Sequence, residues 1–94
     1  MKVFLTRRAE RNYISIKEYI TKEFGDKTAA TFVQKADETF KLLESFPKMG
    51  PVEHNEIRGF QLSRQTRILY RIREQKIIIL SLFDVRQDPK RRPR

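Results

Sequence analysis

The stretch that decides the fold is FGDKTAATFVQKADETFKLLESFPKMG, residues 24–50. Apolar residues recur in it at alternating steps of four and three, which is the spacing of one face of an amphipathic helix. Gly25 is suited to end a preceding helix, Asp26 to cap the next one, and Pro47 to stop it. The predicted apolar stripe of this helix consists of Ala29, Val33, Ala36, Phe40 and Leu43.

A second apolar stripe lies on the N-terminal side of Gly25. Thr6 is a residue type that caps helices, and the stripe after it has steps of four, three, four and four. It consists of Ala9, Tyr13, Ile16, Ile20 and Phe24. Because the link between the two stripes at Gly25 and Asp26 is so short, we expect two helices in an antiparallel hairpin.

The pattern outside the hairpin alternates, which is typical of strands. We expect strands at residues 3–5, 57–62, 67–73 and 76–83, a loop at 48–56, and turns at 63–66 and 74–75. The strand 67–73 separates into two faces, with Ile68, Tyr70 and Ile72 on one and Arg67, Leu69, Arg71 and Arg73 on the other. The strand KIIILSLF, residues 76–83, is apolar on both faces, as expected of a central strand.

The predicted order of elements is therefore βααβββ, in the α+β class. The helix hairpin should pack on one face of a mostly antiparallel sheet, because its apolar stripes must be buried. The opposite face would be open and would carry arginines. A chain of 94 residues fits one domain, residues 1–94, with a basic and loosely held tail at about 87–94.

Positive charge is concentrated in the second half of the chain, whose excess accounts for most of the formal net charge of +9. Residues 57–73 carry five arginines and no acid, and residues 85–94 carry five basic groups against Asp88. A localised field of this kind steers anionic molecules toward it. The sequence therefore predicts an acidic or polyanionic partner.

Composition argues against several kinds of site. The chain has no cysteine and a single histidine, His54, so we expect neither a disulfide framework nor a zinc site, and no metal or cofactor. The N-terminus turns polar after five residues and no long apolar run follows, which indicates neither a signal peptide nor a membrane span. We expect a cytoplasmic protein without a membrane partner.

The candidate binding residues are arginines. The planar guanidinium group fits carboxylate and phosphate oxygens, and several like charges on one face repel one another unless a partner compensates them. The simpler interpretation of each arginine alone is a solvated surface charge. The predicted basic face consists of Arg58, Arg67, Arg71, Arg73 and Arg86.

Three further candidates, Glu53, His54 and Glu56, lie in the loop that precedes the second predicted strand. A carboxylate or an imidazole beside an arginine cluster can act as a general base. No spacing ties these three residues to a mechanism, so the alternative is that they are ordinary loop residues.

Three local patterns together resemble the RelE/ParE superfamily of toxins from bacterial type II toxin–antitoxin modules. They are residues 24–50, the pair IRGF (57–60) and RILYRI (67–72), and IIILSLFDVRQDP (77–89). Each pattern is degenerate alone, whereas their order and spacing cover nearly the whole chain.

The resemblance implies one of two activities. RelE-like members cut messenger RNA in the ribosomal A site, and ParE-like members inhibit DNA gyrase without being nucleases. If the chain is RelE-like, the resemblance implies a metal-independent endoribonuclease. Its catalytic candidates are Arg67 and Arg86, with Glu53, Glu56 or His54 near the position of the acidic base.

The long helix hairpin with its Pro-x-x-Gly ending favours the ParE-like branch, and the chain lacks the terminal His-Tyr pair of one nuclease branch. The resemblance also implies a cognate acidic antitoxin as partner, in a toxin–antitoxin hetero-oligomer, and DNA gyrase or the ribosome with its messenger RNA as target. A third interpretation is a non-toxic nucleic-acid-binding module. The sequence disfavours it, because no aromatic residue alternates with the strand arginines to stack on bases.

Overall fold

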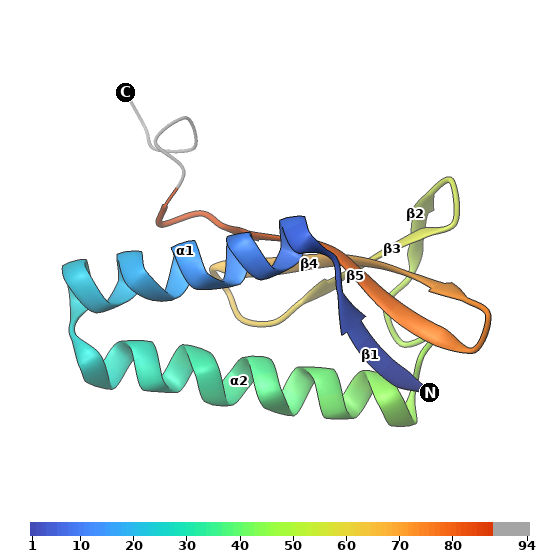
Figure 1. Ribbon diagram of the computed structural model, residues 1–94, viewed down its shortest axis with the longest axis horizontal. Helices are drawn as coiled ribbons and strands as arrows, with labels where there is room; N and C mark the ends of the chain where they lie inside the picture. Colours follow the sequence, from blue (N-terminus) through green and yellow to red (C-terminus); the bar gives the residue numbers. More distant parts are fainter. Residues whose placement is uncertain (88–94) are drawn as a thin grey trace.

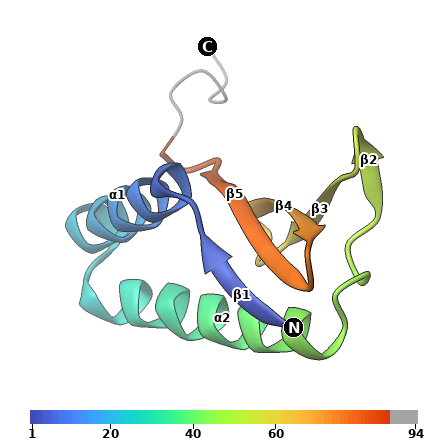
Figure 2. The same ribbon diagram turned by 45° about the vertical axis from the view of Figure 1, so that its right-hand side comes forward.

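The two helices form a hairpin that covers one face of a five-stranded sheet (Figures 1 and 2). This computed structural model describes residues 1–87. The predicted tail at about 87–94 therefore lies, from residue 88 onward, outside the described residues. The elements are β1 (Lys2–Leu5), α1 (Arg7–Phe24), α2 (Asp26–Ser45), β2 (Val52–His54), β3 (Ile57–Gln61), β4 (Thr66–Arg73) and β5 (Lys76–Asp84).

The sheet has the strand order β1-β5-β4-β3-β2 and is mostly antiparallel, as predicted. Only β1 pairs in parallel, alongside β5, and the remaining neighbours in residues 1–87 are antiparallel. The order βααβββ is confirmed, with one short strand added. Residues 52–54, predicted as loop, form β2 at the sheet edge. All three are exposed, so no apolar alternation marks this strand in the sequence.

Tight turns close the two hairpins of the sheet. Asn55 and Glu56 join β2 to β3 with φ of 46° and 63°, and Glu74 and Gln75 join β4 to β5 with φ of 50° and 64°. Two consecutive residues in the left-handed region match the right-handed twist of the strands they connect.

Neither helix within residues 1–87 is long and apolar enough to cross a membrane.

The helix ends partly follow the sequence prediction. Thr6 caps α1 as predicted, because its side chain accepts a hydrogen bond of 3.0 Å from the backbone N–H of Ala9. Gly25 separates the helices with a φ of 94°, a conformation that favours glycine. The prediction that Asp26 caps α2 is wrong: Gly25 holds that position, and Asp26 is the first helical residue. There its charge still complements the helix dipole.

The buried face of α2 is rotated relative to the predicted stripe. Phe32 and Thr39 are buried, although the sequence predicted burial of their neighbours Val33 and Phe40. Val33 and Phe40 are only partly buried and pack at the edge of the core. The buried set on α2 is Ala29, Phe32, Ala36, Thr39 and Leu43. On α1, Phe24 belongs to the predicted stripe but is 51% exposed, because it lies at the very end of the helix.

The start of α1 is attached to β5 next to a bulge in that strand. Leu69 pairs with Ser81 whereas Tyr70 pairs with Ile79, so β5 contains one extra residue, Leu80. The Leu80 carbonyl accepts a 3.1 Å hydrogen bond from the Thr6 hydroxyl. The Leu82 N–H donates one of 3.1 Å to the Asn12 side chain. Residues Thr6 and Asn12 thus bind backbone groups of β5 beyond Ile79, the last residue of β5 that pairs with β1.

Candidate functional site

The open face of the sheet is both cationic and apolar. Along β4, Arg67, Leu69, Arg71 and Arg73 point away from the buried side chains, as predicted. Across the ladder, Phe83, Ile78 and Lys76 of β5 lie opposite Arg67, Arg71 and Arg73, and Phe4 of β1 lies beside Ile78. We call this surface the cationic sheet face; it comprises Phe4, Arg67, Leu69, Arg71, Arg73, Lys76, Ile78 and Phe83.

Arg67 on this face is already paired. Its guanidinium forms an ion pair with the Glu53 carboxylate of β2 and donates a 3.3 Å hydrogen bond to Gln61 Oε1. Gly59 of β3 makes this approach possible, because a Cβ at that position would overlap both the Glu53 and the Arg67 side chains. Two predicted site residues are thus brought together, and a glycine inside a strand was the signal of a close approach there.

Arg71 and Arg73 are unpaired: neither side chain makes a hydrogen bond or ion pair within residues 1–87. The Arg71 Nε is moreover buried without a hydrogen-bond partner. A buried polar group without a partner is costly, and more so when it is part of a charged group. Two cationic side chains on β4 therefore lack a counter-charge from the described part of the chain.

Aromatic rings do lie among these cations. Phe4 is 47% exposed, and the Lys76 Nζ sits 5.7 Å from the centroid of its ring. Phe83 lies directly across the ladder from Arg67. The sequence did not show this arrangement, because the rings come from β1 and β5 rather than from β4. The absence of an aromatic within the arginine face of β4 is therefore no argument against a stacking surface.

Arg58 does not lie on the cationic sheet face, contrary to the prediction. It pairs across the ladder with the buried Tyr70, so its side chain points to the other side of the sheet. There its guanidinium donates to the carbonyl oxygens of Gly50, at 2.8 Å, and Lys48, at 3.2 Å. Arg58 holds the Pro-x-x-Gly segment in place.

Arg86 is also absent from the cationic sheet face. Its Nε and one Nη reach the two oxygens of Asp84 at 3.0 and 2.8 Å, and its guanidinium lies 5.8 Å from the ring centroid of Phe24 on α1. Arg86 also lines a small hollow of about 160 Å³ with Phe32 of α2. It therefore lies on the helix side of the sheet, and Arg67 lies on the open side.

Asp84 anchors this second arginine. The carboxylate is 2% exposed and accepts a 2.6 Å hydrogen bond from the Thr66 hydroxyl in addition to the bonds from Arg86. Burial raises the pKa of Asp84, but the hydrogen bonds and charge of Arg86 and the Thr66 bond outweigh it and hold that pKa below its ordinary value. Sequence reasoning missed Asp84, since nothing local marks it as buried.

His54 and Glu56 are exposed beside the β2–β3 turn. Neither side chain makes a hydrogen bond or an ion pair within residues 1–87. Glu56 lines a hollow of about 220 Å³ together with Arg58 and Ile72. Of the three carboxylate and imidazole candidates, only Glu53 contacts an arginine of the predicted basic face.

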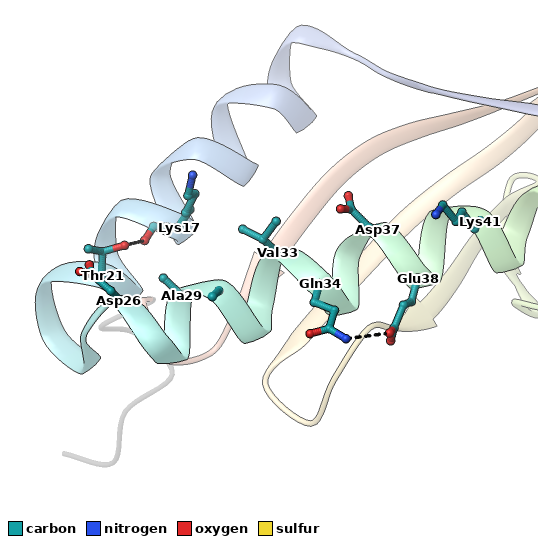
Figure 3. Close-up of a pocket in the computed structure, with 10 residues that line it drawn as sticks. Lys17, Thr21, Asp26, Ala29, Val33, Gln34, Asp37, Glu38 and Lys41 are labelled. Atoms are coloured by element: carbon teal, nitrogen blue, oxygen red, sulfur yellow. Dashed lines mark hydrogen bonds between the residues drawn. The ribbon is translucent and has the colours of Figure 1, made fainter.

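A larger groove of about 620 Å³ lies between α1 and α2 (Figure 3). Charges of both signs line it, including Lys17, Asp37 and Lys41, with Val33 between them. Gln34 donates a 3.2 Å hydrogen bond to Glu38 along its edge. Its lining has three carboxylates and two lysines, so it carries no excess of positive charge and does not compete with the cationic sheet face as a binding site for anions.

Comparison with known proteins gives a consistent result. A family model described as the ParE toxin of the type II toxin–antitoxin system parDE matches residues 3–89. A solved structure described as the chromosomal ParDE system of P. aeruginosa is similar with a TM-score of 0.76 and 25% identity, covering 89% of this chain and 95% of that one.

Two less similar structures share the fold. One is a YoeB/ParE toxin from Agrobacterium tumefaciens, with a TM-score of 0.64, 17% identity, and coverage of 89% of this chain and 98% of that one. The other is a copper-bound mutant toxin from Helicobacter pylori, with a TM-score of 0.63, 13% identity, and coverage of 89% and 93%. The comparison with curated proteins gave no match.

Proposed function

Because the chain belongs to the ParE toxin family of type II toxin–antitoxin systems, we propose that it arrests growth by inhibiting DNA gyrase in the cytoplasm and that a cognate antitoxin neutralises it. Gyrase inhibition is the role that the resemblance implies for the ParE-like branch. The alternative is cleavage of messenger RNA on the ribosome.

One observation favours gyrase inhibition over RNA cleavage: Arg67 and Arg86 lie on opposite sides of the sheet. A metal-independent nuclease must stabilise developing charge on one phosphate with donors that converge on it. Here Arg86 is engaged with the buried Asp84, and Arg67 with Glu53. The five catalytic candidates do not form one site around a shared phosphate position.

The proposal is tested by inducing the chain in a bacterium while following messenger RNA integrity and the DNA-damage response. We expect the DNA-damage response to rise while messages remain intact, because gyrase inhibition disturbs the control of DNA supercoiling and does not act on translation. Co-expression of the antitoxin should relieve the arrest. Rapid cleavage of translated messages without a DNA-damage response would contradict the proposal and identify the chain as a ribosome-dependent nuclease.

A further inference from the structure

We propose that the cationic sheet face binds an acidic polypeptide segment that carries apolar side chains, and that Glu53 is a built-in competitor for the first anion position of that surface. The proposal deepens the proposed function and rests on it in one respect, because a neutralising antitoxin is a partner that would supply such a segment. The structure itself supplies the evidence for the surface and for the competitor.

The first element of that evidence is the row of guanidinium groups on β4. Alternate residues of a strand lie about 7 Å apart on the same face, so Arg67, Arg71 and Arg73 form a regular row interrupted by Leu69. Arg67 holds a carboxylate, whereas Arg71 and Arg73 hold no anion from residues 1–87. The row thus has one occupied anion position and two open ones.

The second element is the chemistry of the occupant. The group on Arg67 is a carboxylate from another strand, and its side chain lies across the face above Gly59. Carboxylate and guanidinium groups match each other in planar geometry. Glu53 therefore shows which kind of anion this face accommodates, and an acidic side chain of a partner would present the same group to Arg71 and Arg73.

The third element is the apolar surface between the cations. Leu69 and Ile78 are aliphatic, and they lie between the rings of Phe4 and Phe83 on the same face. Aliphatic side chains pack well against apolar side chains of a polypeptide and gain nothing from a phosphate backbone. Phe4 adds an exposed ring at the β1 end of the face. A segment with both acids and apolar residues fits this surface better than a uniform polyanion.

Glu53 is held weakly enough to exchange. The side chains of Arg67 and Glu53 are 37% and 33% exposed, and β2 is a three-residue strand at the edge of the sheet. An ion pair with this much solvent contact is easily replaced by another of the same kind. A partner carboxylate would displace Glu53 from Arg67, so Glu53 lowers the affinity of the face for anions until such a partner is present.

The test measures binding of a fluorescein-labelled peptide of alternating glutamate and leucine by anisotropy. A peptide with glutamine in place of glutamate and an oligothymidylate of equal charge serve as comparison probes. The variants are Arg71→Ala, Arg73→Ala and Glu53→Gln. Their matched controls are Arg8→Ala and Glu23→Gln, which make the same charge changes at exposed positions of α1. Thermal melts of every variant verify that it is folded.

We expect Arg71→Ala and Arg73→Ala to weaken binding of the acidic peptide about 5-fold or more, as truncation of a contributing contact does. Glu53→Gln should tighten it about 2- to 5-fold, because Arg67 is released from an exposed ion pair. Both control variants should change it less than about 2-fold, since both side chains are exposed on α1, which covers the opposite face of the sheet, and an exposed charge without a direct contact contributes little. The glutamine peptide should bind more weakly than the acidic one.

Three results would overturn the proposal. If Glu53→Gln binds no more tightly than Glu23→Gln, Glu53 is not a competitor. If Arg8→Ala weakens binding as much as Arg71→Ala, the attraction is diffuse charge and not this face. If oligothymidylate binds as tightly as the acidic peptide, the face is a nucleic-acid surface. Because none of these measurements involves gyrase or growth, the surface and the proposed function can fail separately.

Discussion

Folding buries the Asp84 carboxylate and surrounds it with hydrogen-bond donors. Thr66, the backbone of Arg86 and the Arg86 guanidinium all bind it. The bonds join the start of β4 to the turn that follows β5. The Asp84 side chain thus links the end of the sheet to Arg86 and holds the Arg86 guanidinium beside it.

Acid should weaken the protein partly through Asp84. The pKa of Asp84 in the folded state lies below the ordinary value of 3.8. Its contribution to the free energy of unfolding is therefore complete above about pH 4 and is lost as the pH falls through the folded-state pKa. We expect Asp84→Asn to lower the melting temperature at neutral pH. The difference in melting temperature between the variant and the parent should narrow below about pH 4. Melting curves recorded from neutral pH down to acid check this, and a gap that stays constant would contradict it.

At the residue scale, the sequence predicted which side chains share a face of β4 but not which charged side chains pair with one another. The arginines of β4 and their alternation follow from a period of two, and so do the buried Ile68 and Tyr70. The Glu53–Arg67 pair depends on the register of β2 and on Gly59, which are set by contacts between separate segments. The side of Arg58 follows from the alternation of its own strand, which puts it on the face of Phe60, so the prediction for Arg58 did not apply the period of two. The side of Arg86, which follows the last strand, is set by its bonds to Asp84.

At the scale of elements, the helix hairpin and the strands β1, β3, β4 and β5 were predictable. The helices and β4 have a clear period of their own, and β5 is an unbroken apolar run, which is typical of a central strand. The strand β2 and the bulge at Leu80 could not be predicted. All residues of β2 are exposed, and the bulge is seen only in the pairing of β4 with β5. The phase of α2 depends on its packing against α1 and β1, where Phe32 meets Tyr13 of α1. Val33 and Phe32 are adjacent and both apolar, and periodicity alone does not choose between them.

Two phenylalanines test the helix phase. Phe32 is 3% exposed and its ring centroid lies 5.4 Å from that of Tyr13, whereas Phe24 is 51% exposed. We expect Phe32→Ala to cost about 3–5 kcal/mol of unfolding free energy, through lost transfer energy and the cavity left behind. Phe24→Ala should cost about 1 kcal/mol or less, because it removes only surface contacts with Tyr19 and Arg86. Urea unfolding measures both, and equal costs would show that the buried face of the helix hairpin is wrongly assigned.

At the scale of the whole molecule, the sheet separates two groups of charges. On the helix side, Arg58 and Arg86 are bound by carbonyl groups and by a buried carboxylate, and they stabilise the fold. On the open side, Arg67 forms a partly exposed ion pair with Glu53, and Arg71 and Arg73 are unpaired within residues 1–87. Within residues 1–87, the arginines on the two sides of the sheet therefore differ in their surroundings, and the proposal of an anionic partner concerns the open side.

The measurement that tests the central claim most directly is supercoiling of relaxed plasmid by purified gyrase in the presence of the purified chain, alongside ribosomes programmed with a defined message. We predict that the chain inhibits supercoiling and leaves the message intact. Arg86→Ala should change inhibition only as far as it destabilises the fold, because Arg86 binds Asp84 on the helix side. Cleavage of the message in the ribosomal A site, with gyrase unaffected, would contradict the account.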